Sequence, residues 1–150
     1  MTASSTAILL VEDDANDVLL IRRAFAKAAI TNPVHNVEDG DAAVAYLAGE
    51  GSYADRDDHP LPAVVLLDLK LPRRSGLEVL AWARREEKLK RLPIVVLTSS
   101  RELADVNRAY ELGANSYLVK PVEFQQLLDM VKVFDGYWRG LNELPEIGAV

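Results

Sequence analysis

The stretch that decides the fold runs from Ala63 to Gly76 and reads Ala-Val-Val-Leu-Leu-Asp-Leu-Lys-Leu-Pro-Arg-Arg-Ser-Gly. Its apolar run, residues 64–67, is typical of a strand that is buried on both faces, as in a parallel sheet. The run ends on Asp68, and Pro72 and Gly76 then prevent the strand from continuing. Asp68 is therefore predicted at the carboxyl end of a central strand, which is the edge where open α/β sheets bind ligands. A single acid at such a position more often only caps a turn, so a functional role for Asp68 needs support from other residues of the chain.

The composition limits the classes of protein that the chain can represent. Its 150 residues suffice for one domain with a hydrophobic core, and 49% apolar residues exclude a disordered chain. The net charge of −6 argues against nucleic-acid binding, which usually needs a basic face. The absence of cysteine excludes disulfides, thiolate metal sites and a cysteine nucleophile, and it fits the cytoplasm. We expect one domain over residues 1–150, with a core at about 7–138 and an extension at 139–150.

The first residues carry no basic segment of the kind that opens a signal peptide. The apolar run that follows, from Ala7 to Val11, is interrupted by Glu12. We therefore expect neither a signal peptide nor a segment that spans a membrane.

Apolar runs and helical periodicity alternate along the whole chain. The predicted strands cover residues 7–11, 31–37, 64–67, 94–97 and 116–119, and the predicted helices cover residues 14–28, 41–48, 75–83, 102–112 and 123–138. A strand followed by a helix, repeated five times, predicts a doubly wound (βα)5 sandwich around a five-stranded parallel sheet.

Four predicted strands end in residues that can carry chemistry. The first ends in the acids Glu12, Asp13 and Asp14, and the third ends in Asp68. The remaining two end in hydroxyl residues and in a cation, namely Thr98-Ser99-Ser100 and Lys120-Pro121. Asp14 is a candidate cap for the first helix, with Asp17 in its first turn. Adjacent carboxylates repel one another, and a divalent cation with hard oxygen ligands, such as Mg²⁺, would relieve the repulsion.

The polar segment from residue 49 to residue 62 offers a second, weaker metal hypothesis. It contains the acids Asp55, Asp57 and Asp58 together with His59. A solvated surface loop explains these residues equally well, and we interpret the segment in that way. The other histidine, His35, is interpreted as a surface residue of the second strand.

The sequence resembles the receiver domains of two-component response regulators, the CheY-like family. The similarity spans residues 7–128 and is strongest in the segments Leu10-Val11-Glu12-Asp13-Asp14, Leu67-Asp68-Leu69-Lys70-Leu71-Pro72, Val96-Leu97-Thr98-Ser99 and Tyr117-Leu118-Val119-Lys120-Pro121. The long loop, the Glu-Asp pair and the C-terminal extension resemble one branch, the stand-alone regulators of bacterial phytochrome histidine kinases. The resemblance implies a flavodoxin-like strand order of 2-1-3-4-5.

The resemblance also implies a set of functional residues. Asp68 would be the phosphoacceptor, which takes its phosphoryl group from a sensor histidine kinase. Mg²⁺, or Mn²⁺ or Ca²⁺ in its place, would be held by Glu12, Asp13, Asp68 and the backbone carbonyl of Lys70. Many family members carry Asp where Glu12 stands, so Asp13 is the more secure ligand of the two.

Further residues would bind the phosphoryl group and couple its binding to a change at the protein surface. The resemblance assigns this role to Thr98, Ser99 and Lys120, with a cis peptide bond before Pro121, and it couples Thr98 to Tyr117. The pair would remodel the surface formed by the fourth helix, the fifth strand and the fifth helix. The chain would then be no enzyme in the usual sense, although it would take part in its own phosphorylation and dephosphorylation.

The last helix carries more apolar residues than one buried face requires. We predict that the surplus forms a twofold homodimer through this helix and the fifth strand, because exposed apolar patches usually mark interfaces. The candidate interface residues are Phe124, Leu128, Met130, Val133, Phe134, Tyr137 and Trp138, extended by Leu141. Residues 142–150 are expected to be loosely ordered.

Three alternative functions fit the sequence less well. A haloacid-dehalogenase-type phosphatase would carry a second Asp two residues after its nucleophile, where this chain has Lys70. A flavin-binding domain would have a phosphate-binding loop of hydroxyls and glycines after the first strand, where this chain has acids. A DNA-binding effector would show a basic helix. Protein partners therefore remain, a kinase and a target protein, without nucleic acid or membrane.

Overall fold

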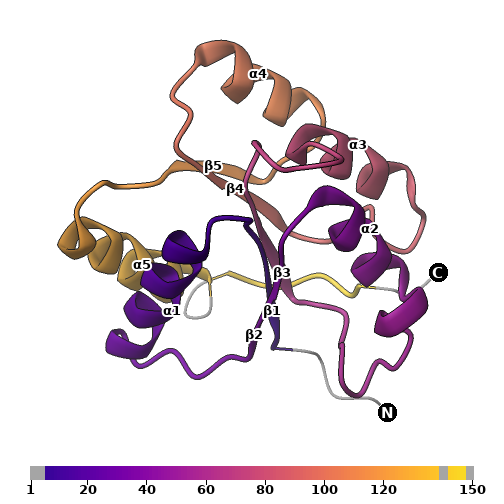
Figure 1. Cartoon of the computed structure of the whole chain (residues 1–150), viewed down its shortest axis with the longest axis horizontal. Helices are drawn as coiled ribbons and strands as arrows, with labels where there is room; N and C mark the ends of the chain where they lie inside the picture. Colours follow the sequence, from indigo (N-terminus) through magenta and orange to yellow (C-terminus); the bar gives the residue numbers. More distant parts are fainter. Residues whose placement is uncertain (1–5, 139–141, 148–150) are drawn as a thin grey trace.

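The computed structural model describes residues 6–138 and 142–147, and strands and helices alternate through them (Figure 1). A single parallel sheet has the strand order β2-β1-β3-β4-β5, which confirms the predicted topology. Its strands are β1 (Ile8–Val11), β2 (Val34–Val37), β3 (Val64–Leu67), β4 (Ile94–Thr98) and β5 (Ser116–Val119).

Local side-chain signals set the helix boundaries. Asp14 caps the first helix by accepting hydrogen bonds from the backbone N–H groups of Asn16 and Asp17, as predicted. Ser75 and Glu78 form a reciprocal capping box at the start of the third helix. The helices are α1 (Ala15–Lys27), α2 (Gly40–Ala48), α3 (Gly76–Arg85), α4 (Leu103–Glu111) and α5 (Phe124–Trp138). Among the described residues, no helix is long and apolar enough to cross a bilayer.

The helices form a layer on each side of the sheet. Helices α1 and α5 contact each other on one face, and α2, α3 and α4 follow one another on the opposite face (Figure 1). Side chains along β1 alternate accordingly: Ile8 and Leu10 pack toward α1 and α5, whereas Leu9 and Val11 pack toward α2 and α3. Helices therefore cover both faces of the sheet, and the ends of its strands remain as the places where a ligand can bind.

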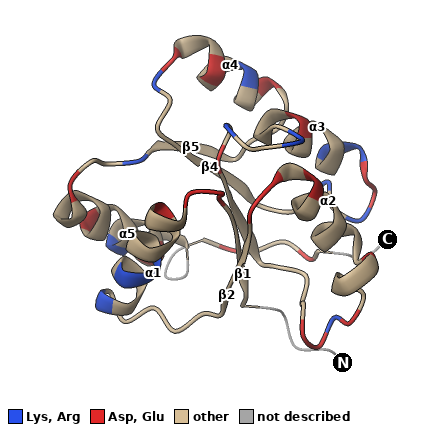
Figure 2. Cartoon of the chain, viewed as in Figure 1, with Lys and Arg blue, Asp and Glu red and all other residues tan. Residues whose placement is uncertain are grey.

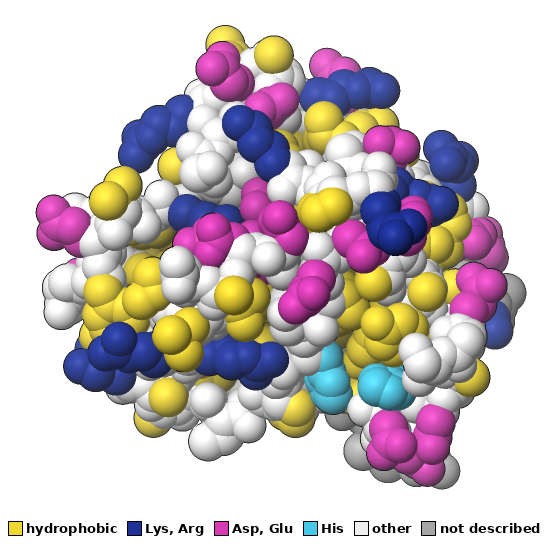
Figure 3. Space-filling model, viewed as in Figure 1, with side chains coloured by type: hydrophobic (Ala, Val, Ile, Leu, Met, Phe, Trp, Pro, Cys, Tyr) yellow, Lys and Arg dark blue, Asp and Glu magenta, His cyan; other side chains and the backbone are white. Residues whose placement is uncertain are grey.

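The segment between α2 and β3 leaves Asp55, Asp57 and Asp58 exposed, as interpreted from the sequence, while other residues of the segment pack against the domain. It begins with a 3₁₀ turn, η1 (Gly51–Tyr53). The guanidinium of Arg56 donates hydrogen bonds to the carbonyls of Tyr46 and Leu47 at the end of α2. The rings of Tyr46, Tyr53 and His59 lie with centroids 5.2 to 5.8 Å apart. Figure 3 shows the histidine side chains next to each other on the surface.

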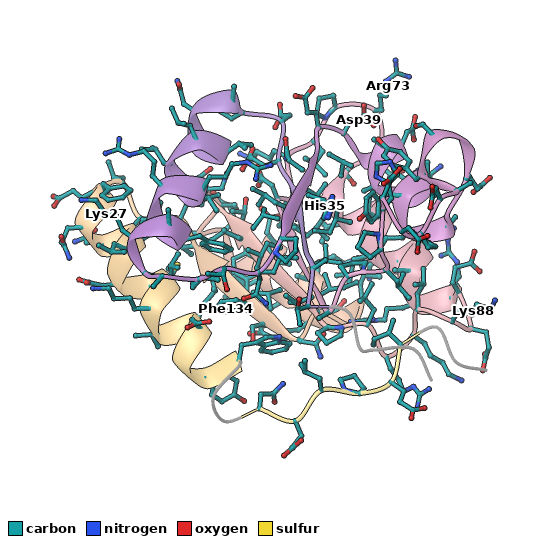
Figure 4. All side chains as sticks on the ribbon, turned by 90° about the horizontal axis from the view of Figure 1, so that it is seen from below. Lys27, His35, Asp39, Arg73, Lys88 and Phe134 are labelled. Carbon is teal, nitrogen blue, oxygen red and sulfur yellow. The ribbon has the colours of Figure 1, made fainter. Side chains whose placement is uncertain are left out.

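The C-terminal segment contacts the domain at two described residues. Asn142 donates its backbone N–H to the carbonyl of Tyr137 at 2.8 Å, and Ile147 packs against the core on the α2 and α3 side. The segment thus runs beneath the strands from α5 to the opposite layer (Figure 4). Asn142 and Ile147 are partly buried and residues 143–146 are exposed, while residues 139–141, which include Leu141, and residues 148–150 lie outside the described residues.

The close approach of α3 to the end of β3 makes a testable prediction. A Cβ atom on Gly76 would lie 2.2 Å from the carbonyl oxygen of Asp68, whereas a Cβ on Gly136 would meet no atom of the described residues within 4 Å. We expect Gly76→Ala to lower the free energy of unfolding by about 2 kcal/mol or more, because the backbone must move. Gly136→Ala, within α5, should raise it by about 0.5–1 kcal/mol.

Urea denaturation of both variants beside the wild-type chain measures these changes. Equal free energies of unfolding for Gly76→Ala and the wild type would show that α3 does not approach Asp68 this closely.

Candidate functional site

The register of the sheet brings the predicted strand-end residues to one edge. Val11 pairs with Leu67, so Glu12 and Asp68 follow side by side, and the Asp68 N–H donates to the Val11 carbonyl at 3.1 Å. On the other side of β3, the Lys120 N–H donates to the Thr98 carbonyl at 2.8 Å. Acidic segments accordingly follow β1 and β2 at this edge in Figure 2.

Three carboxylates form the centre of this edge. Oxygen atoms of Glu12, Asp13 and Asp68 lie within 4.8 Å of one another. Glu12 is 1% exposed and Asp68 is 7% exposed, while Asp13 is open to solvent. The Leu69 N–H donates to Asp68 Oδ1 at 2.8 Å and fixes the carboxylate. Figure 3 shows acidic side chains gathered near the middle of the face in view.

The side chain of Lys120 reaches from the end of β5 into the carboxylates. Its Nζ donates hydrogen bonds to Glu12, to Asp17 Oδ2 at 2.9 Å and to Asp68 Oδ2 at 3.3 Å. Burial opposes the charge of this ammonium, but the hydrogen bonds to Glu12 and Asp17 and the charge of Asp68 outweigh it, so the pKa of Lys120 is raised. Lys120 therefore stays charged and acts as the internal counter-ion of the acids.

Glu12 is the most perturbed acid at this edge. Burial raises its pKa from the ordinary value of 4.5 to about 7, with a further contribution from the charge of Asp68. The hydrogen bonds from Lys120 and from the Asp14 N–H act in the opposite direction without cancelling the effect of burial. Near neutral pH, the protonated and the ionised form of the Glu12 carboxyl are therefore populated to similar extents.

Hydroxyl groups line the end of β4 and connect the edge to α4. Thr98 is fully buried, and its Oγ1 accepts a long hydrogen bond of 3.5 Å from the Ser100 N–H. The Ser100 hydroxyl donates to Asp105 Oδ2 at 2.6 Å, and the Tyr117 hydroxyl donates to the Ser100 carbonyl at 3.0 Å. Burial raises the pKa of Tyr117, which keeps this phenol protonated. Ser99, between Thr98 and Ser100 in the sequence, has an exposed side chain.

Two residues of the site carry roles that sequence reasoning missed. Asp17 was assigned only to the first turn of α1, but it also binds Lys120. Ser100 was one hydroxyl in a run of three, and the structure makes it the link between Thr98, Tyr117 and α4. The side chain of Lys70 is exposed. The described residues contain no cis peptide bond, so the one expected before Pro121 is not observed.

A second candidate surface lies along α5 and β5. A groove of about 470 Å³ runs between them, and the exposed side chains of Val133 (72%) and Tyr137 (56%) form part of its wall. Of the predicted interface residues, Leu128 is buried within its own chain, and Phe124 lies beneath the Arg23 guanidinium of α1 at 5.2 Å. The remaining predicted residues line the groove: Met130, Val133, Phe134, Tyr137 and Trp138.

The raised pKa of Glu12 predicts an unusual dependence of stability on pH. Because this carboxyl is protonated more readily in the folded than in the unfolded chain, stability falls as pH rises from 4.5 to about 7 and stays lower above that range. Relative to Glu12→Gln, the wild-type chain should lose on the order of 3 kcal/mol across this interval.

Chemical denaturation in the presence of a chelator, at several pH values, measures the difference between the two proteins. The same change at the exposed Glu50 serves as the control. The raised pKa of Glu12 would be contradicted if the difference in free energy of unfolding between the wild type and Glu12→Gln were constant with pH. It would also be contradicted if that difference changed in favour of the wild type as the pH rises.

Comparison with known proteins extends the match beyond the site. The family model described as "Response regulator receiver domain" matches residues 8–132. The probable methanogenesis regulatory protein FilR2 of Methanothrix harundinacea is 43% identical over 92% of this chain and 86% of its own length. The response regulator Rcp1 of Synechocystis is 39% identical over 92% of both chains.

Solved structures agree with the sequence matches. The Mn²⁺-bound form of Rcp1 superposes with a TM-score of 0.84 over 94% of this chain and 99% of its own, at 38% identity. The phosphorylated cyanobacterial phytochrome response regulator RcpA superposes with a TM-score of 0.87 at 38% identity, over 95% of this chain and all of its own. The fold, the strand-end residues and these matches agree, and the chain belongs to the response regulator receiver domain family.

Proposed function

We propose that the chain is a single-domain response regulator in which Asp68 accepts a phosphoryl group from a histidine kinase. The observation that carries the proposal is the setting of the Asp68 carboxylate. Its Oδ1 accepts the Leu69 N–H at 2.8 Å, and its Oδ2 lies 3.3 Å from the ammonium of Lys120. One oxygen is thus held in place, and the other faces the cation that can neutralise an incoming phosphoryl group.

The transfer asks little covalent chemistry of the protein. The Asp68 oxygen forms a bond to phosphorus while the bond between phosphorus and the histidine nitrogen of the kinase breaks. A carboxylate is a weak nucleophile, so positioning and charge neutralisation carry the catalysis. Lys120 contributes the neutralisation as a mobile point charge, which can exchange Glu12 and Asp17 for phosphoryl oxygens.

The donor set at this edge fits a hard divalent cation. The carboxylates of Glu12, Asp17 and Asp68 contact one ammonium, and that of Asp13 lies beside Glu12 and Asp68, so negative charge remains in excess even before a phosphoryl group arrives. We propose that Glu12, Asp13, Asp68 and the Lys70 carbonyl hold Mg²⁺, with Mn²⁺ or Ca²⁺ able to substitute. When bound, the ion neutralises negative charge shared between Asp68 and the phosphoryl oxygens. The Mn²⁺-bound structure of Rcp1 supports this assignment.

The hydroxyl residues offer a route from the site to the surface. The Thr98 hydroxyl now accepts only a long hydrogen bond, so it can turn to the phosphoryl group, with the Ser99 N–H as a second donor. Such a movement shifts the segment that holds Ser100, to which Tyr117 and Asp105 are both bonded. Phosphorylation, which adds roughly two negative charges, would therefore bias the surface of α4, β5 and α5.

The comparisons support a particular kind of kinase as the donor. RcpA is a phytochrome response regulator that was crystallised in its phosphorylated form, and it superposes over 95% of this chain. We propose a bacteriophytochrome histidine kinase as the partner of this chain.

The groove along α5 supports a twofold homodimer. Val133 and Tyr137 are the exposed apolar side chains of this surface, and the groove behind them is lined largely by apolar groups of β5 and α5. Packing α5 against its copy would bury these side chains, which a single chain leaves in contact with water.

The phosphoacceptor role predicts the outcome of one chemical test. Incubation of the wild-type chain with acetyl phosphate and Mg²⁺ should add the mass of one phosphoryl group, and a chelator should prevent the addition. Asp68→Asn should show no adduct because the nucleophilic oxygen is lost. Asp14→Asn is the matched control, since Asn caps α1 as well as Asp does and should leave the adduct unchanged.

Intact-mass spectrometry measures the adduct, and phosphotransfer from a purified phytochrome histidine kinase measures the donor assignment. An adduct on Asp68→Asn would rule out Asp68 as the acceptor.

The dimer predicts a change in sedimentation. Val133→Glu should weaken self-association at least tenfold, because the charge would be buried in the interface without a partner (roughly 2 kcal/mol or more). Leu19→Glu, at an exposed apolar position of α1, is the control and should leave association unchanged. Sedimentation velocity over a range of concentrations measures both. A wild-type chain that stays monomeric at all concentrations, with and without phosphorylation, would contradict the dimer.

A further inference from the structure

We propose that the end of the sheet opposite the carboxylates holds a binding site for a small, uncharged, largely apolar molecule that carries a hydroxyl group. The site is a cavity of about 160 Å³ between α1, α5, the first residues of β1 and β3, and the C-terminal segment. The inference does not depend on the proposed phosphorylation, because the cavity shares no residue with the acidic edge.

Apolar side chains form most of the cavity wall. Phe25 and Ile30 contribute from α1 and the turn after it, Ile8 and Val64 from the strand starts, and Phe134 from α5. Figure 4, which views this end of the molecule, labels Phe134 between α5 and the strands. A cavity of about this size with a purely apolar wall stays dry and accepts a molecule such as benzene. The volume therefore suits a ligand with one six-membered ring and one small substituent.

Two buried polar atoms in the wall have no hydrogen-bond partner among the described residues, Trp138 Nε1 and Asn32 Oδ1. Trp138 Nε1 is a donor, and Asn32 Oδ1 is an acceptor. The amide of Asn32 is oriented by its own Nδ2, which donates to the Thr6 carbonyl at 2.8 Å, so the oxygen is the free end. A buried polar atom without a partner costs free energy that a suitable ligand recovers.

This pair of atoms defines the chemistry of the ligand. A hydroxyl group can accept a hydrogen bond from Trp138 Nε1 through its oxygen and can donate one to Asn32 Oδ1 through its proton, so it matches the chemistry of either atom. A fully charged ligand is disfavoured, because the wall is mostly apolar and its one ionisable residue is the acid Asp135. A phenol or a small aromatic alcohol meets all these conditions, whereas toluene matches the shape without the hydrogen bonds.

The chain provides its own reporter for the test. Its two tryptophans are Trp82, which packs against the core on the α2 and α3 side, and Trp138. In a two-dimensional NMR spectrum of the ¹⁵N-labelled full-length chain, phenol should shift the indole N–H signal of Trp138 in a saturable manner and leave that of Trp82 in place. The expected dissociation constant is about 0.1–1 mM, a range that suits a ligand of seven non-hydrogen atoms.

Toluene and two variants separate the hydroxyl from the ring. Toluene should bind at least about threefold more weakly than phenol to the wild-type chain, because it leaves both polar atoms unpaired. Trp138→Phe, followed through backbone signals, should reduce this preference, whereas Ile30→Phe, which narrows the cavity from the opposite wall, should weaken both ligands. Non-saturable shifts, equal shifts of both indole signals, or equal affinities of phenol and toluene for the wild-type chain would overturn the proposal.

Discussion

The ammonium of Lys120, bonded to carboxylates from three separate elements, is the interaction on which the site depends. Glu12 follows β1, Asp17 lies in α1 and Asp68 follows β3, and each would face the others as a like charge without the cation. Removing one partner of such a buried cluster leaves charge uncompensated, which is more costly than the cluster is stabilising. Lys120 therefore fixes the end of β5 to the centre of the sheet and compensates part of the negative charge of the acids.

The fold makes this arrangement possible because it gathers chain segments that are far apart. Lys120 and Glu12 are separated by 108 residues, and only the order β2-β1-β3-β4-β5 brings their strand ends to one edge. Because apolar layers cover both faces of the sheet, the polar residues at these strand ends are the ones that water and a ligand can reach. At the opposite end of the strands, Asn142 and Leu144 of the C-terminal segment form part of the wall of a small cavity. The two ends of one sheet thus differ in character: one gathers carboxylates and an ammonium, and the other has a small cavity with a mostly apolar wall.

The sequence alone predicted the strands and helix starts that depend on local signals. Unbroken apolar runs located β1, β3 and β4, and caps such as Asp14 and Ser75 located helix starts. Asp17 and Ser100 were missed because their roles come from residues distant in sequence, which no local pattern reports. The acids after α2 are solvated as expected, but the hydrogen bonds from Arg56 to the end of that helix were not predicted, because the polar composition of the segment conceals them.

We propose that Lys120 exchanges Glu12 and Asp17 for a phosphoryl group on Asp68. A crystal structure of the chain with Mg²⁺ and beryllium trifluoride, a stable mimic of the phosphoryl group, tests it most directly. We expect beryllium bonded to an Asp68 oxygen, with Lys120 Nζ in contact with a fluoride and no longer bonded to both Glu12 and Asp17. Beryllium on another carboxylate, or Lys120 still bonded to both acids beside an occupied Asp68, would contradict it.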